Sequence, residues 1–478
     1  MHERNIKGLL RLVTFAVLLV CTVSVIFFAR FRPAYFSNIN YLGAFLLLEL
    51  IIASSWHYEK SFFALLMVGF LWAGLDIPFT EVWTSARWLV LGVGAAIGYV
   101  KWMKGQRQHF GAAHLVAFFC VVAALVSALV SAYPQLALAK VLSLCLLFVY
   151  TSSGARLAIL GREAHFVKGL LLGCEIIVYV SAFAYLLFHL EIWGNPNSLG
   201  AMMGVVAEPF LLWGTLVSDT PGLRYRRAFA LLLCAYLLYF SLSRAGMVAG
   251  AIATVVLCLS LRKQRLIIQG TIVVVFFLTL AAIVEPAHFE RFTASFTSSV
   301  LYKGKQEKGL FGSRKTPWQE TISVIDEHPW FGSGFGTASG NRTYWEAGSF
   351  SSTSTTTREH GSSYLAITEW VGLLGIIPFV LLLFLVLQTV ARVCSWMHQT
   401  ASPCHYSIPL AIVLVAGLAH AIFEDWLFAV GYYLTVFFWS LAFMLMDMAP
   451  TAIRTPASAA IGWRSEVTPQ PTALFISR

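Results

Sequence analysis

Residues 266–284 read LIIQGTIVVVFFLTLAAIV, a run without a single charged side chain. An apolar run of about 20 residues is long enough to cross the hydrocarbon core of a bilayer as a helix. The fold class that follows is an all-α polytopic membrane protein with about 12–14 transmembrane helices. Comparable runs predict spans at 10–28, 39–55, 61–79, 83–100, 112–132, 135–151, 166–189, 196–217, 228–243, 245–261, 266–284, 362–391, 405–424 and 426–447.

The composition of the chain agrees with a protein whose main solvent is lipid. Of its 478 residues, 58% are hydrophobic and 12% are charged, whereas about a quarter of the residues of a soluble domain are charged. The net charge of +10 could suggest a nucleic-acid partner, but the basic residues form short clusters between the apolar runs. That distribution is typical of membrane topology, so we expect the lipid bilayer and no nucleic acid as a partner.

The sequence shows no signature of a metal or nucleotide cofactor. Most of the eight cysteines fall inside apolar runs, and none has the spacing of a metal-ligand set. No Walker loop is present, and the one glycine-rich turn lacks the strand that a dinucleotide site requires. We therefore expect no metal and no cofactor.

The basic clusters in the short loops fall on one side of the membrane. Positive charge marks the cytoplasmic side, which places both termini in the cytoplasm and residues 285–361 outside it. The chain then divides into an N-terminal transmembrane bundle (1–284), an extracytoplasmic loop with a short helix (285–361), C-terminal transmembrane helices (362–448) and a disordered tail (449–478). The cytoplasmic clusters are Arg4/Lys7/Arg11, Lys60, Lys101/Lys104/Arg107, Arg156/Arg162/Lys168, Arg224/Arg226/Arg227, Arg262/Lys263/Arg265 and Arg392.

Arg244 is the first candidate for a functional side chain. It follows Ser243 between two apolar spans, at the outer edge of the membrane. An arginine at that depth costs free energy unless it binds an anion or lines a water-filled cavity, which favours a functional role. The alternative to a functional role is a side chain that extends to the membrane interface, where its charge is hydrated. Gly246 and Gly250 are spaced as a small-residue pair that lets another helix pack closely.

Arg314 and Lys315 form a second candidate site in the long loop. Residues 316–319 read TPWQ, a capping box with proline at the first helical position, and the helix is expected to end near His328. The N-terminus of a helix attracts anions, so two cations beside it predict a phosphate or pyrophosphate site. The alternative is an ordinary solvated basic pair.

His360 is the third candidate, with Arg358 just before it and Tyr364 just after it. A histidine at the outer mouth of the bundle could take a proton from an acceptor hydroxyl, although a surface histidine at a helix start is the plainer alternative. Glu369 lies nine residues further on, about two and a half helical turns away. If the helix already includes His360, these two side chains point to opposite faces, so we interpret Glu369 as a buried structural carboxyl paired with a neighbouring helix.

A polar segment, GNPNSLG at 194–200, opens the predicted span at 196–217. Asparagine followed by proline is typical of a helix start, so one interpretation is that this segment only begins the helix. The amides of Asn195 and Asn197 could also bind sugar hydroxyls.

Several of these segments, in this order, resemble the O-antigen ligase family, which also includes O-antigen and exopolysaccharide polymerases. The resemblance covers residues 194–440, and this chain has Gly361 where the family often has asparagine. The matching pieces are GNPNSLG at 194–200, SRAG at 243–246, Arg314 with Trp318, HPWFGSGFG at 328–336, and His360 with Leu365, Glu369 and GLLG at 372–375.

The resemblance implies a glycosyltransferase of the bacterial inner membrane, related to the GT-C architecture and with its long loop in the periplasm. The donor would be a glycan on undecaprenyl diphosphate. Arg244, Arg314 and His360 match the family's functional positions, and Lys315, Asn195, Asn197, Arg358 and Tyr364 are expected to bind substrate.

Two functions that share this donor are the main candidates, attachment of the glycan to a protein is a less favoured third, and a transporter belongs to another class. An O-antigen ligase transfers the glycan to lipid A-core, which we favour, whereas a polymerase extends an O-antigen or an exopolysaccharide. A transporter of a small anion or a lipid-linked sugar would place polar residues at the midplane of several spans. This chain has its unusual charges at the outer edge instead.

Overall fold

The computed structural model describes most of residues 63–103, 111–286, 312–337 and 359–450, with short gaps inside these ranges. The described part is helical throughout and contains no strand. Its α-helices are α5 (Thr80–Met103), α6 (Ala112–Val130), α7 (Pro134–Val149), α8 (Ala155–Ile159), α9 (Glu163–Phe188), α10 (Pro196–Ala201), α11 (Glu208–Leu216), α12 (Pro221–Phe240), α13 (Arg244–Ser260), α14 (Gln264–Val284), α16 (Gly312–Glu327), α17 (Ser363–Thr400), α18 (Ser407–His420) and α19 (Tyr433–Met448), and two π-helical stretches are η1 (Tyr150–Gly154) and η2 (Met202–Ala207).

The helices confirm an all-α polytopic membrane protein. Five continuous helical stretches are long and apolar enough to cross a bilayer: α6, α7 with η1 and α8, α9, α10 with η2 and α11, and α17. The shorter helices α13, α18 and α19 are also apolar. The first two predicted spans, 10–28 and 39–55, lie outside the described residues, as does nearly all of the predicted tail, so the count of helices stays a prediction.

Two of the predicted spans have different boundaries in the structure. The spans at 405–424 and 426–447 were expected to be almost continuous, but α18 ends at His420 and α19 begins at Tyr433. The intervening segment 421–432 is a chain of turns, with Phe423 N donating to His420 O and Ala429 N donating to Trp426 O. Its apolar composition hides the break, because hydropathy does not register backbone conformation.

Close helix packing brings α10 and η2 against the start of α13. A Cβ at Gly246 would overlap the carbonyl oxygen of Gly200, and a Cβ at Gly204 would overlap the carbonyl oxygen of Gly246. Gly250 lies against the carboxyl group of Glu208 in the same way. The small-residue pair predicted for α13 is confirmed as a surface that lets a neighbouring helix approach closely.

Helix α17 is broken at Gly372, and the loop that follows α16 fills the break. Gly372 has φ 70° and ψ 179°, a conformation that only glycine adopts readily. Ser333 N donates to Glu369 O at 2.9 Å, and Leu373 N donates to Pro329 O at 2.7 Å. The loop therefore satisfies the last carbonyl of one helical segment and the first amide of the next.

The glycines of the HPWFGSGFG segment are required by this contact. A Cβ at Gly332 would overlap the carbonyl of Trp370, and one at Gly372 would overlap the carbonyl of Trp330. The loop is also tied to the bundle, because Lys140 Nζ on α7 donates to Gly336 O. Hydrogen bonds from this segment therefore connect the break in α17 with α7.

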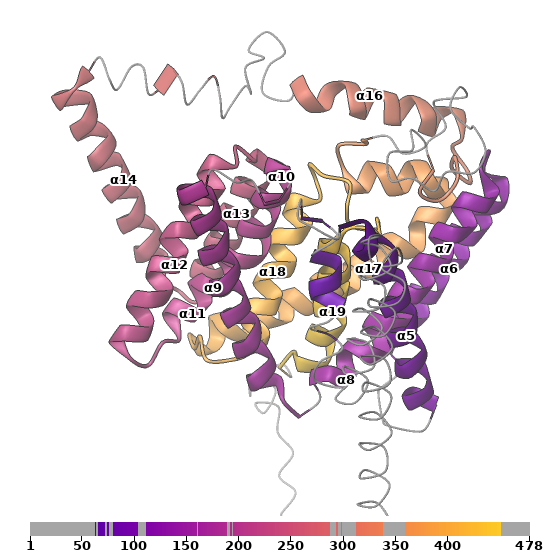
Figure 1. Cartoon of the computed structure of the whole chain (residues 1–478), viewed down its shortest axis with the longest axis horizontal. Helices are drawn as coiled ribbons and strands as arrows, with labels where there is room; N and C mark the ends of the chain where they lie inside the picture. Colours follow the sequence, from indigo (N-terminus) through magenta and orange to yellow (C-terminus); the bar gives the residue numbers. More distant parts are fainter. Residues whose placement is uncertain are drawn as a thin grey trace, which may run out of the picture.

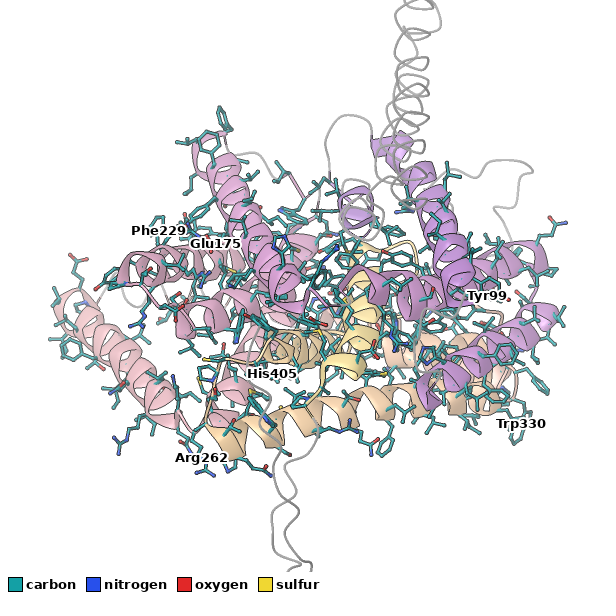
Figure 2. The ribbon with its side chains drawn as sticks, turned by 90° about the horizontal axis from the view of Figure 1, so that it is seen from below. Tyr99, Glu175, Phe229, Arg262, Trp330 and His405 are labelled. Atoms are coloured by element: carbon teal, nitrogen blue, oxygen red, sulfur yellow. The ribbon has the colours of Figure 1, made fainter. Side chains whose placement is uncertain are left out.

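The long loop and the bundle meet at one end of the molecule. Figure 1 shows α16 lying across the upper edge of the bundle, at the end where α10 lies. Seen from below, α17 is the long helix along one side, with Trp330 near its first end and Arg262 near its other end (Figure 2). Since α13 carries Arg244 at its start and is followed by Arg262, these two arginines mark opposite ends of the bundle.

Candidate functional site

The structure brings Arg244, Arg314 and His360 to the same end of the bundle from three separate segments. Arg244 is the first residue of α13, and Ser243 caps that helix by accepting a hydrogen bond from Gly246 N at 3.3 Å. The positive charge of Arg314 acts on Arg244, so the two guanidinium groups repel each other. Two cations held close together form an arrangement that an anion between them would stabilise.

Arg314 lies inside the first turn of α16, which corrects the predicted start of this helix. The helix begins at Gly312, four residues before Thr316, and Pro317 lies within it. Because proline has no N–H, Pro317 cannot donate to the carbonyl four residues earlier, and α16 lacks one helical hydrogen bond there. Lys315 lies in the same turn and is exposed.

Two carboxyl groups hold the guanidinium of Arg314. Nη1 pairs with Oε1 of Glu359, whose side chain is 59% exposed, and Nη2 pairs with Oε1 of Glu424, whose side chain is 16% exposed. Trp318, one turn further along α16, donates its indole N–H to Gly361 O at 3.1 Å. These contacts fix the start of α16 on the segment that carries His360.

His360 lies between two carboxyl groups beneath this contact. Its Nδ1 and its backbone N–H both approach Oδ2 of Asp425, at 3.0 and 2.9 Å. On the other side of the ring, Nε2 lies 3.5 Å from Oε2 of Glu369. Trp370 meets the imidazole edge to face at 5.3 Å, and only 2% of the His360 side chain is exposed.

The contact between His360 and Glu369 corrects the prediction that these two residues do not share a site. That prediction assumed a helix running through His360, whereas α17 begins at Ser363. Gly361 has φ 68° and Ser362 is extended, so the chain folds back before the helix starts. The imidazole thereby reaches the face of the first helical segment that carries Glu369.

The carboxyl groups around His360 raise the pKa of its imidazole. Burial by itself works to lower the pKa, but the contacts with Asp425 and Glu369 outweigh it. The pKa of Asp425 is lowered, because the hydrogen bonds from His360 overcome the opposing effect of burial. Asp425 is therefore the hydrogen-bond acceptor of this pair, and Nδ1 of His360 is the donor.

Glu424 and Asp425 are the parts of the site that sequence reasoning missed. Both lie in the segment 421–432, which was expected to be nearly all helix. Ser363 fixes this segment to the start of α17, since its Oγ donates to Glu424 O at 2.6 Å and accepts from Leu427 N at 3.0 Å. Two adjacent acids within an apolar run were the available signal, because such residues are costly in a membrane unless paired.

The other predicted substrate-binding residues have mainly structural contacts in the described part. Asn195 caps α10, with its Oδ1 accepting from Asn197 N at 2.8 Å, so the predicted helix start is confirmed. Tyr364 donates its hydroxyl to Leu418 O at 2.9 Å. Arg358 lies outside the described residues. A sugar-binding role for these side chains stays a prediction.

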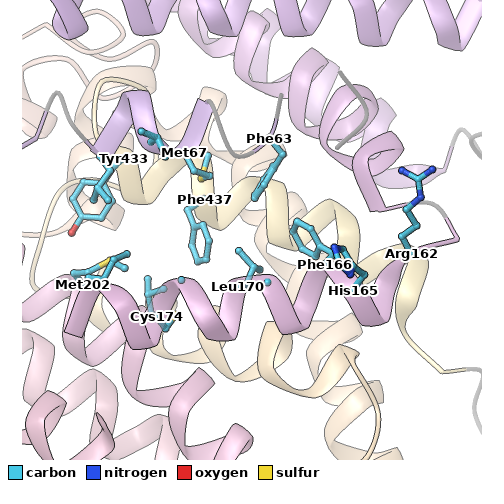
Figure 3. A pocket seen from close by; sticks show the side chains of 16 residues that line it. Phe63, Met67, Arg162, His165, Phe166, Leu170, Cys174, Met202, Tyr433 and Phe437 are labelled. Atoms are coloured by element: carbon cyan, nitrogen blue, oxygen red, sulfur yellow. The ribbon is translucent and has the colours of Figure 1, made fainter. Parts of the chain in front are cut away.

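A mainly apolar cavity in the described part is separate from this cluster. It has a volume of about 420 Å³ and runs along α9, with Arg162 and His165 at one end and Tyr433 at the other (Figure 3). Its lining is otherwise apolar, and none of the three residues Arg244, Arg314 and His360 lines it. Such a cavity suits a hydrocarbon chain, because its walls offer few polar partners.

In the described ranges, no group of three or more His, Cys, Asp and Glu side chains is arranged to hold a metal ion. The chemistry that the cluster itself offers is of two kinds. Arg244 and Arg314 can bind an anion with several acceptor oxygens, and His360 can exchange a proton.

The fold and this cluster define a polytopic α-helical membrane protein with two arginines and a histidine gathered at one end of its bundle. Residues 229–380 match the family model described as O-Antigen ligase, so this part of the chain is similar to that family. The matched range contains Arg244, Arg314, His360 and Glu369. No curated protein matches the chain.

Proposed function

We propose that the protein transfers a glycan from undecaprenyl diphosphate to an acceptor hydroxyl at the periplasmic face of the inner membrane. The proposal rests on one observation above all: Arg244, Arg314 and His360 meet at one end of the bundle, although they are far apart in sequence. A diphosphate leaving group needs cations, and an attacking hydroxyl needs a proton acceptor. The cluster supplies both.

In this reaction the acceptor oxygen forms a bond with the anomeric carbon, while the bond from that carbon to the diphosphate oxygen breaks. Arg244 and Arg314 bind the diphosphate and stabilise the negative charge that develops on it. His360 takes the proton of the acceptor hydroxyl. Glu359 is the exposed partner of Arg314, so it is the carboxylate that the donor displaces.

The experiment is a transfer assay with purified protein in detergent, a lipid-linked glycan and an acceptor, in which released undecaprenyl diphosphate is measured. Arg244→Ala should lower the release at least 100-fold, because one of the two cations is lost. Arg265→Ala is the matched control, since this exposed arginine lies beyond the opposite end of α13 and should leave the rate unchanged. Equal rates for Arg244→Ala and wild type would sink the proposal.

The acceptor decides between the two activities of the family. We favour the ligase, in which lipid A-core receives the finished glycan. A deletion strain should then accumulate lipid-linked polymer and lose capped lipid A-core. A strain that accumulates single lipid-linked repeat units would instead identify a polymerase.

A further inference from the structure

The hydrogen bonds around His360 determine which ring nitrogen is available as a base. Oδ2 of Asp425 already accepts the backbone N–H of His360, so the second contact to that oxygen is a donation from Nδ1–H. In a neutral imidazole with the proton on Nδ1, the basic atom is Nε2. That atom faces Glu369 at 3.5 Å, beyond the length of a normal hydrogen bond.

Glu369 thus faces Nε2 on the side of the ring opposite Asp425, at a longer distance than the hydrogen bond between Nδ1 and Asp425. Its side chain is fully buried, at 0% exposure, on the first helical segment of α17. A neutral Nε2 turns a lone pair toward the carboxyl oxygen, whereas a protonated Nε2 turns an N–H toward it. The contact thus favours the protonated ring, and in a buried setting this electrostatic preference is weakly screened.

We propose that Glu369 is a positioning residue for glycan transfer, which orients the imidazole of His360 and stabilises the imidazolium that forms when Nε2 receives the acceptor proton. This inference rests on the function proposed above. The proton leaves the acceptor oxygen and binds Nε2, and the electron pair of the broken O–H bond enters the new bond to the anomeric carbon. The electron pair of the old bond leaves with the diphosphate, so atoms and charges balance.

Other charged groups lie around His360 and must be included in any test based on pH. Asp425 on the segment 421–432 contacts Nδ1, and Glu369 on α17 contacts Nε2. Arg314 on α16 lies above them, paired with Glu359 and Glu424. Asp425 and Glu369 are the two charged groups that raise the pKa of the imidazole, whereas the positive charge of Arg314 acts on Arg244.

The test is the pH profile of kcat/KM for Glu369→Gln, a variant of nearly equal size without the charge. The rate requires a neutral His360, so it falls as the pH drops through the pKa of the imidazole. Loss of the negative charge at Nε2 lowers that pKa, so the acidic limb should move to lower pH. The plateau should fall about tenfold to 100-fold, because the imidazolium is less stable.

A structural role for Glu369 gives a different result. Ser333→Ala is the control, since it removes a hydroxyl that contacts the backbone carbonyl of Glu369 at 3.4 Å and leaves the charge intact. The acidic limb of the pH profile of Ser333→Ala should stay at the wild-type pH. Glu369→Asp keeps the charge and guards against poor folding of the glutamine variant, and its limb should lie within about 0.5 pH unit of wild type.

The outcomes separate the two proposals. If Glu369→Gln lowers the plateau without moving the limb, or leaves both unchanged, the role of Glu369 is wrong. A Glu369→Asp variant with a displaced limb contradicts it equally. If His360→Ala retains wild-type activity in the same assay, the proposed function itself fails.

Discussion

The start of α13 and the segment 421–432 both contribute side chains to the candidate site, yet only the first was assigned to it from the sequence. Arg244 stands out because it is a lone cation at an outer hairpin, where every basic cluster nearby belongs to the opposite side. Asp425 lies at the boundary between the predicted spans 405–424 and 426–447, but nothing in the sequence pairs it with His360. The comparison teaches that an unusual charge can mark a candidate site residue in the sequence, whereas the side chains that gather around the site depend on where the helices end.

The largest effect is expected from replacing Asp425, the carboxyl group that the sequence did not link to His360. Asp425→Asn can still accept the backbone N–H of His360 but no longer stabilises a charged imidazole. We expect kcat to fall about 100-fold with little change in the KM of the donor. The acidic limb of the pH profile should move to lower pH, because Asp425 raises the pKa of His360.

Asp326→Asn is the control for this variant, since it removes an exposed acid from α16 and should not change kcat or the limb. If Asp425→Asn changes only the KM of the donor, then the segment 421–432 serves binding and has no part in orienting His360.

Periodicity and hydropathy were enough to predict the apolar helices and one close helix contact. The helices and their apolar character follow from the length of the runs, and the glycine pair of α13 follows from its spacing. The break of α17 was not predictable, because Gly372 is conformationally free in isolation and only the loop at 329–333 fixes its φ. The contact of His360 with Glu369 follows from where α17 begins, and helix boundaries are the least certain feature of a sequence.

A smaller effect is expected from a substitution of Ser363, which binds the segment 421–432 to the start of α17. Ser363→Ala leaves the amide of Leu427 without its acceptor and the carbonyl of Glu424 without its donor. An unsatisfied buried amide costs about 1–3 kcal/mol, so the midpoint of thermal unfolding in detergent should fall by several degrees.

Because Asp425 would shift with this segment, the transfer rate of Ser363→Ala should also fall, by about tenfold. Ser323→Ala on the exposed face of α16 serves as the control for both measurements. A loss of stability without any loss of rate would show that the segment 421–432 can move without disturbing His360.

The smallest effect separates the two carboxylates that hold Arg314. Glu359 is exposed, so its ion pair contributes about 0.2–1 kcal/mol, and the donor must compete with it for the guanidinium. Glu359→Gln should therefore lower the KM of the lipid-linked donor about twofold to fivefold, with kcat unchanged. Glu327→Gln, an exposed acid at the other end of α16, controls for the general loss of negative charge. A raised KM in Glu359→Gln would mean that Glu359 orients Arg314 toward the diphosphate, and the exposed carboxylate would then belong with Asp425 among the groups that position the site.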